Sequence, residues 1–348
     1  MFDNKEKTNL NEMGEFGLIQ HLTQTIQLTN ESSVKGIGDD AAVLDFKDKK
    51  TLISTDLLLE NVHFDLRYVP LKHLGYKAIQ VNLSDIYAMN GIASQVTISI
   101  GVSSKFPLEA LEELYAGALI ACEKYKVDLV GGDTSTSTQG LVISVTSIGY
   151  AEADEIAYRS GAKEGDLLCV SGDLGGAYVG LQILEREKQI YLENPEIQPD
   201  LEGKDYIIER QLKPEARKDV VELFRHLHVK PHAMIDVSDG LASEILHICN
   251  ASNLGCKLYE DKIPIDPMTY ETAREFGLDP TVCALSGGED YELLFTVPQS
   301  DYDKVKNQLD ISIIGYMTEP AAGQKMISKS GSEHDIVAQG WNAFTKKD

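Results

Sequence analysis

The first half of the chain alternates between two spacings of apolar residues, one typical of strands and one typical of helices. Short β-branched or alternating runs predict strands at 51–55, 95–102 and 141–150. Apolar residues three or four positions apart predict helices at 71–89 and from Pro107 to about residue 125. We expect the first of these strands to stop at Asp56. This alternation predicts an α/β domain.

The second half begins after a polar turn at 159–166 and repeats the order of strand and helix. A strand at 167–170 leads through a glycine turn into a helix, and a second strand-to-helix unit follows at 233–250. A further strand is expected at 291–297, and the charged, proline-containing stretch at 188–206 is expected to be a surface loop. The fold class is therefore mixed α/β with two domains, predicted at 1–155 and 156–348.

Composition narrows the possible partners. With 55 acidic and 32 basic residues the formal net charge is −23, which argues against binding to nucleic acid or to an anionic membrane. Five cysteines without Cys-x-x-Cys spacing fit a reducing compartment. Residues 86–104 carry no charge, but their asparagine and glycines indicate a helix end, a turn and a strand instead of a membrane span. We expect a cytoplasmic protein.

Candidate chemistry lies in short runs in which an aspartate stands beside glycine, serine or threonine. No cysteine or histidine cluster accompanies them, and ligand sets made only of oxygen suit magnesium, calcium or manganese. Carboxylates brought together repel one another unless a cation lies between them, so the pattern predicts a magnesium site that handles phosphates. The runs are Gly-Ile-Gly-Asp-Asp at 36–40, Ile-Ser-Thr-Asp at 53–56, Asn-Leu-Ser-Asp at 82–85, Gly-Gly-Asp at 131–133, Ile-Asp-Val-Ser-Asp-Gly at 235–240 and Ser-Gly-Gly-Glu-Asp-Tyr-Glu at 286–292.

Each run also has a simpler interpretation. Ser238 or Asp239 could cap the helix that follows, although a cap does not account for Asp236 at the end of an apolar strand. Asp85, on an apolar helix, could pair with Lys77 instead of a metal. The runs at 39–40, 54–56 and 131–133 are also common turn sequences.

Other motifs are less specific. The glycine turn at 172–176 resembles a phosphate cradle but matches neither a P-loop nor a full dinucleotide fingerprint, and a structural role is the alternative. His63 follows the first strand closely enough to share its site, or it is a packed residue. Arg159 is either a solvated arginine or a phosphate clamp.

Taken together and in this order, the runs closely resemble those of thiamine-monophosphate kinases, within the aminoimidazole ribonucleotide synthetase superfamily. The resemblance also includes Asn-Val-His-Phe at 61–64 and Arg-Ser-Gly-Ala at 159–162, and it covers about residues 14–344. It implies ATP-dependent phosphorylation of thiamine monophosphate to thiamine diphosphate. It also implies a homodimer in which the sheets of two N-terminal domains pair, with ATP and several Mg²⁺ ions in a cleft between the domains.

The resemblance assigns roles by matching motifs. It implies magnesium ligands at Asp40, Ser54, Thr55, Asp56, Asp85, Asp133, Asp236 and Asp239. It implies ATP contacts at Tyr115, Gly132, Arg159 and Ser238, and a thiamine monophosphate pocket lined by His63, Glu289 and Trp341. Trp341 could instead anchor the C-terminal tail. The glycine turn departs from the family's Gly-Asp-Ser form, because Gly176, Ala177 and Tyr178 stand there.

Two non-kinase alternatives follow from the same residues. An aminoimidazole ribonucleotide synthetase is the nearest other enzyme, and a non-catalytic acidic metal-binding protein could keep this fold. For the kinase we expect direct in-line transfer without a phosphorylated protein intermediate and without a catalytic side chain, because the acceptor phosphate oxygen is already a competent nucleophile.

Overall fold

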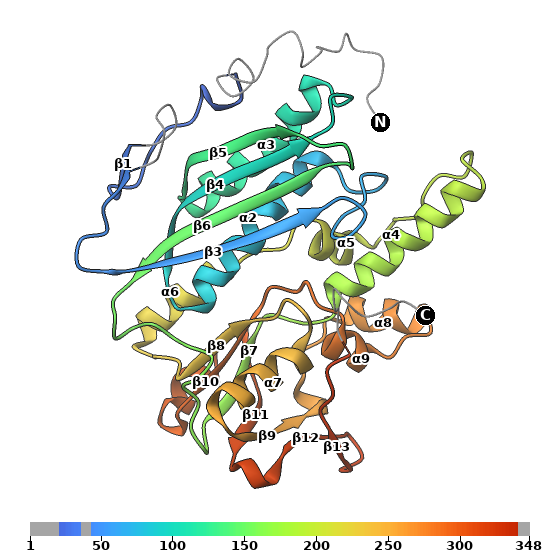
Figure 1. Ribbon diagram of the computed structural model, residues 1–348. Coiled ribbons are helices and arrows are strands. Elements are labelled where there is room, and N and C mark those ends of the chain that lie inside the picture. The colour runs from blue at the N-terminus through green and yellow to red at the C-terminus, as the bar shows by residue number, and fades with distance from the viewer. Residues whose placement is uncertain (1–20, 36–42, 340–348) are drawn as a thin grey trace. The chain divides into compact units, whose positions relative to one another are not determined.

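The computed structural model describes residues 21–35 and 43–339 (Figure 1). The chain forms two compact units. Unit 1 comprises Met1–Ile86 and Gly91–Asp154, and unit 2 comprises Tyr87–Asn90 and Glu155–Asp348. Each unit is described by itself.

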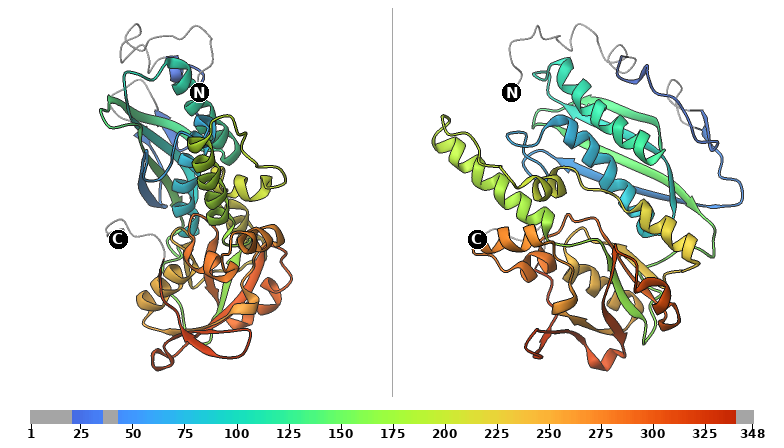
Figure 2. Two further views of the ribbon diagram at one scale, coloured as in Figure 1. Left: turned by 90° about the vertical axis from the view of Figure 1, so that its right-hand side faces the viewer. Right: turned by 180° about the vertical axis from the view of Figure 1, so that it is seen from behind.

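Unit 1 is built on a four-stranded sheet whose strand order is β3-β6-β4-β5. Its strands are β3 (Lys50–Leu59), β4 (Ile92–Val102), β5 (Asp128–Thr136) and β6 (Val142–Ala151), and the β1 (Ser33–Lys35) and β2 (Val43–Leu44) strands pair separately. Only β4 and β5 run parallel in the larger sheet. Helices α2 (Leu71–Ala88) and α3 (Leu108–Tyr125) cover one of its faces (Figure 2).

Strand β3 presents its side chains to two different environments. Leu58 is buried, whereas Ile53 and Leu57 are 68% and 50% exposed on the face without helices. The prediction that this strand ends at Asp56 is wrong. The ladder with β6 continues to the pair Leu59–Val142, because the alternation of side chains persists beyond the aspartate.

Glycines fix helix α2 against α3. A Cβ atom at Gly75 would lie 1.9 Å from the carbonyl oxygen of Leu114, and one at Gly117 would lie 1.8 Å from that of Lys72. Only glycine allows the two helix backbones to approach this closely. Both contacts lie in the N-terminal half of α2, and Asn82 and Asp85 follow in its C-terminal half.

Unit 2 contains a seven-stranded sheet, in the order β13-β12-β9-β11-β7-β10-β8. The strands are β7 (Leu167–Ser171), β8 (Ala233–Asp236), β9 (Gly255–Tyr259), β10 (Leu293–Val297), β11 (Ile311–Thr318), β12 (Gln324–Ile327) and β13 (Glu333–Asp335). Neighbours run antiparallel except β9 and β12. Helix α7 (Leu241–Ser252) packs on β8 and β10, and its apolar residues join those of the central strands in one core.

The remaining helices of unit 2 correct one further prediction. The main ones are α4 (Gly176–Glu193), α5 (Asp205–Leu212), α6 (Lys218–Leu227), α8 (Pro267–Glu275), α9 (Pro280–Ser286) and the short α10 (Tyr302–Val305). The expected loop at 188–206 is therefore limited to residues 194–204, because α4 continues to Glu193. No helix in the described ranges is long and apolar enough to span a bilayer.

Candidate functional site

In unit 1, two aspartates from different elements face each other on the helix-covered face of the sheet. Asp56 lies on β3, and Asp85 lies in the last turns of α2. Burial, and next the charge of Asp85, raise the pKa of Asp56 to about 6. Ser54, two residues before Asp56 and on the same face, donates its hydroxyl to Asp85 Oδ2 at 2.5 Å. The fold thus brings together three of the predicted magnesium ligands as oxygen donors.

Neighbouring polar groups hold this arrangement in place. The Asn82 side-chain oxygen accepts the Asp56 backbone N–H at 3.0 Å, and its amide nitrogen donates to Ala78 O within α2. His63 Nδ1 accepts the Leu59 N–H at 3.0 Å, so in a neutral imidazole the proton resides on Nε2. His63 is half-buried in the loop that follows β3.

Thr55 differs from its two neighbours. Its side chain projects from the opposite face of the strand, where its hydroxyl donates to Val145 O at 3.0 Å and accepts from Thr146. If Thr55 binds a metal on the helix-covered face, it therefore does so through its main-chain carbonyl oxygen.

The predicted ligand Asp133 lies at the other edge of the same sheet. One row of paired residues crosses the four strands and consists of Asp56, Val145, Ile98 and Gly132. Asp133 belongs to the next row and is exposed. Packing within the sheet is one reason for a glycine at 132, because a Cβ there would lie 1.9 Å from Ile98 O. Within one chain, the carboxylates of Asp56 and Asp133 are therefore separated by two strands.

In unit 2, the run at 235–240 forms a second acidic site. Asp236 ends strand β8 and is 4% exposed. Helix α7 begins after Gly240, and no side chain in the described part of unit 2 caps it. The capping alternative for Ser238 and Asp239 therefore does not apply, and both side chains are half-buried.

Glu244, which is not among the predicted site residues, belongs to this site. It is 2% exposed, and its Oε1 accepts the Asp239 N–H at 3.1 Å. Burial raises the pKa of Glu244 to about 8, to which the charges of Asp236 and Asp239 contribute, while Arg159 acts in the opposite direction. The sequence signal was an acidic residue on the apolar face of a helix, among Leu241 and Ile245.

The run at 286–292 forms a turn beside this acidic site. Glu289 N donates to Ser238 O at 2.7 Å, and Tyr291 N donates to Val237 O at 2.9 Å. Glu289 and Tyr291 have φ angles of 59° and 52°, in the left-handed region that favours glycine. Strand β10 begins two residues later than predicted, because Tyr291 is part of this turn.

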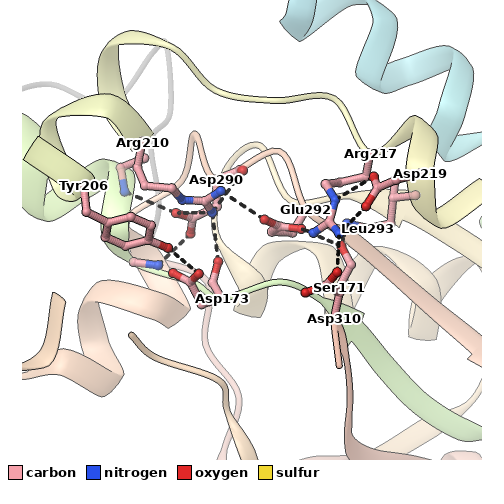
Figure 3. A network of polar contacts seen from close by, with 12 residues as sticks. Ser171, Asp173, Tyr206, Arg210, Arg217, Asp219, Asp290, Glu292, Leu293 and Asp310 are labelled. Atoms are coloured by element: carbon pink, nitrogen blue, oxygen red, sulfur yellow. Dashed lines mark hydrogen bonds and ion pairs between the residues drawn. The ribbon is translucent and has the colours of Figure 1, made fainter. Parts of the chain in front are cut away.

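Arginines neutralise the other two acidic residues of the turn (Figure 3). Arg217 and Arg210 both bind Glu292, the latter at 3.0 Å, and Ser171 donates to Glu292 Oε2 at 2.6 Å. Arg210 also lies 3.7 Å from Asp290. Glu292 and Asp290 are both buried, at 2% and 1% exposure, so they belong to the interior of unit 2.

Asp290 also accounts for the glycine turn at 172–176. Its carboxylate accepts the backbone N–H of Gly175 at 2.7 Å and that of Ala177 at 3.3 Å, at the start of helix α4. An internal carboxylate therefore lies where a phosphate would bind to a helix N-terminus. This contact favours the structural interpretation of the turn over a phosphate cradle.

The remaining predicted residues have simpler positions. Tyr115 is a buried residue of α3, at 8% exposure, and burial raises its pKa to about 12. Arg159 is exposed, next to the start of unit 2. Asp40 and Trp341 lie outside the described residues.

The described residues hold no group of three or more His, Cys, Asp or Glu side chains placed to bind a metal ion. The predicted ligands are instead divided between the two units. In each unit, however, neighbouring carboxylates raise the pKa of one acidic residue, Asp56 in unit 1 and Glu244 in unit 2, and the donors are oxygen atoms. This donor chemistry fits a hard divalent cation such as Mg²⁺.

Family models place both units in one family. The AIR synthase related protein N-terminal domain matches residues 38–151, and the C-terminal domain of the same family matches residues 163–325. A thiamine-monophosphate kinase of Aquifex aeolicus is 37% identical over 310 residues, which is 89% of this chain and 93% of that protein. The chain belongs to the thiamine-monophosphate kinase family. The predicted family and the predicted class of enzyme are thereby confirmed.

Further relatives agree with this membership. The thiamine-monophosphate kinase of Bacillus subtilis is 35% identical and covers 95% of this chain and 100% of its own length. The solved structure of AaThiL complexed with AMPPCP and TMP matches with a TM-score of 0.73 at 34% identity, over 98% of this chain and 100% of that one. The hydrogenase maturation protein HypE, at 18% identity and a TM-score of 0.72, shares the fold. These matches confirm the predicted fold class.

Proposed function

We propose that this protein transfers the γ-phosphate of ATP to thiamine monophosphate, which yields thiamine diphosphate. The observation that carries the proposal is a close relative, AaThiL, whose structure contains both AMPPCP and TMP and whose whole length the chain matches. The acidic runs of the sequence support it, because Asp56 with Asp85, and Asp236 with Glu244, supply the oxygen donors that a phosphate-binding cation needs.

We assign the cation sites to the residues predicted from the sequence. Ser54, Asp56, Asp85 and the main chain of Thr55 would serve unit 1, and Asp236 and Asp239 would serve unit 2, with Asp40 and Asp133 as further ligands. Bound Mg²⁺ would neutralise charge on the two phosphate groups, which otherwise repel each other. Glu244 extends this set as the carboxylate that holds the Asp239 backbone.

The protein's own residues act mainly by binding and orientation. Arg159 and Ser238, with Tyr115 and Gly132, would contact ATP, and His63, Glu289 and Trp341 would line the thiamine monophosphate pocket. Neutral His63 can donate from Nε2 to a phosphate oxygen, because its Nδ1 already accepts the Leu59 N–H. The acceptor monoester needs no general base, so we infer direct in-line transfer.

Product analysis tests this function. Purified protein with ATP, Mg²⁺ and thiamine monophosphate should form thiamine diphosphate, and phosphoribosylformylglycinamidine, the substrate of an aminoimidazole ribonucleotide synthetase, should give no product. Labelled ATP should leave no label on the protein after denaturation. Failure to form thiamine diphosphate would refute the proposed function, and a labelled protein would refute direct transfer alone.

We also infer that two copies pair through the sheet of unit 1. Strands β3 and β5 are the outermost of its four strands, so Asp56 and Asp133 lie about 14 Å apart along the sheet. One cation cannot bind both within a chain. Pairing of β3 with β5 of a second copy would place the strands that carry them side by side, and it would satisfy the unpaired backbone groups of both edges.

Subunit mixing tests this pairing. We would purify a heterodimer of one Asp56→Asn and one Asp133→Asn subunit, selected by two different affinity tags. If Asp133 comes from the partner, the heterodimer contains one intact site and should show about half of the wild-type activity. Both homodimeric variants serve as inactive controls. A heterodimer as inactive as its parents would contradict a shared site.

A further inference from the structure

The turn that carries Glu289 is held in an unfavourable backbone conformation. Two of its non-glycine residues, Glu289 and Tyr291, adopt left-handed φ angles, which persist only where the surroundings enforce them. Main-chain hydrogen bonds to Ser238 and Val237 supply that enforcement. They fix the backbone at Glu289 but leave the direction of its carboxylate to a side-chain contact.

Gln211 provides one such contact. Its Nε2 donates to Glu289 Oε2 at 2.9 Å, and the residue is buried at 5% exposure in the last turn of α5. The donor is a neutral amide, whereas Arg210 and Arg217 bind the other acidic residues of the turn. An amide can hold a carboxylate in one orientation without neutralising its charge.

Helix α5 is itself fixed, so Gln211 cannot follow the carboxylate if the latter moves. A Cβ at Gly180 would lie 2.3 Å from Ile207 O, which shows that α4 and α5 are in close backbone contact. The guanidinium of Arg210, the adjacent residue, binds Glu292 at 3.0 Å and the Asp173 carbonyl at 2.9 Å. These contacts join α5 to the turn at 286–292 through Glu292 and to the glycine turn at 172–176 through Asp173 (Figure 3).

We propose that Gln211 is a positioning residue for the substrate. It holds the Glu289 carboxylate in one orientation, in which the carboxylate faces the cationic thiazolium portion of thiamine monophosphate. This inference rests on the proposed function, in which Glu289 lines the substrate pocket. It assigns Gln211 a role in the affinity for the acceptor and none in ATP binding.

Steady-state kinetics of Gln211→Leu test the inference. Leucine keeps most of the side-chain volume but removes the donor. We expect the KM for thiamine monophosphate to rise about ten-fold, while kcat and the KM for ATP change less than about three-fold. Gln308→Leu is the matched control, because Gln308 Nε2 also donates a hydrogen bond of 2.9 Å, to Lys304 O on α10, and both KM values should be unchanged there.

A double-mutant cycle distinguishes positioning from general destabilisation. Glu289→Ala should raise the KM for thiamine monophosphate by itself, and adding Gln211→Leu should then have no further effect. Equal rises in both KM values, an unchanged KM in Gln211→Leu, or additive effects in the double variant would each overturn the inference. If Gln211→Leu does not fold, Gln211→Glu replaces it, both with wild-type Glu289 and with Glu289→Ala. The inference again requires that the two substitutions are not additive.

The controls separate this inference from the proposed function. If the wild-type protein forms no thiamine diphosphate, the proposed function fails and the inference fails with it. If the wild type is active and Glu289→Ala raises the KM for thiamine monophosphate, but Gln211→Leu does not, then only the role of Gln211 is overturned.

Discussion

Two acidic clusters in unit 2 contain similar residues in opposite electrostatic surroundings. Around Glu292 and Asp290, arginines 210 and 217 face the carboxylates. Around Glu244, the charges that raise its pKa are those of other carboxylates, Asp236 and Asp239. The pair Asp56 and Asp85 in unit 1 resembles the second case. Carboxylates neutralised by the protein belong to its interior, whereas carboxylates that repel one another are suited to an external cation.

The largest expected effect on activity comes from removing a carboxylate that is suited to bind the external cation. Asp56→Asn and Asp236→Asn should each lower thiamine diphosphate formation by about a thousand-fold, which corresponds to about 4 kcal/mol of transition-state stabilisation. Without metal, neither variant should unfold more readily than the wild type, because a repelling charge has been removed. Asp335→Asn, in an exposed pair with Lys325, is the control. Wild-type turnover in either variant would remove that residue from the site.

Removing an arginine that neutralises an internal carboxylate should lower the stability of the protein instead. Arg217→Met leaves buried Glu292 with one arginine, and we expect the free energy of unfolding to fall by about 3 kcal/mol. Urea denaturation measures this change. Arg225→Met replaces an exposed arginine of α6 and should cost less than about 0.5 kcal/mol. Equal stability of the two variants would mean that Glu292 does not depend on Arg217.

Burial, which outweighs the effect of Arg210, predicts a pH dependence at Asp290. Burial raises the pKa of Asp290 to about 7, from 3.8 for an unperturbed aspartate, although Arg210 and the N–H groups of Gly175 and Ala177 act in the opposite direction. Between these values the folded state retains a proton that the unfolded state has lost. The free energy of unfolding therefore falls as the pH rises through this range.

Asp290→Asn isolates this contribution. Unfolding measured in urea at pH 5, 6, 7 and 8, with a chelator present, should show a smaller decrease for the variant than for the wild type. The difference between the two proteins should change most below pH 7. Parallel curves would contradict the raised pKa, and a steeper decrease in the variant would reverse its sign.

The sequence was most informative where function requires several residues in a short run. Asp56, Asp85 and Asp236 could be selected because each belongs to a short run with hydroxyl residues, and the structure places the first two together. Gln211 could not, since its importance depends on a contact with a residue 78 positions away. A single amide on a helix carries no such signal in sequence, whereas the acidic Glu244 on the apolar face of α7 does.

Element boundaries show the same limit. The sequence predicts a strand end at Asp56 because the residue is polar, but main-chain pairing with β6 continues through it. Similarly, α4 extends into the charged stretch after Lys188, since a helix on the surface of unit 2 tolerates charged residues. In both cases hydrogen bonding between backbone groups outweighed side-chain polarity.

The smallest expected effect distinguishes the two faces of β3. Thr55→Val removes a hydroxyl that bonds within the sheet on the face away from Asp56, and it should change turnover by less than about three-fold. Ser54→Ala removes the hydroxyl bound to Asp85 and should lower turnover by about ten-fold. Turnover at saturating Mg²⁺ and its half-saturating concentration measure both effects. A loss in Thr55→Val as large as that in Ser54→Ala would place the Thr55 hydroxyl in the metal site and contradict the division between the two faces.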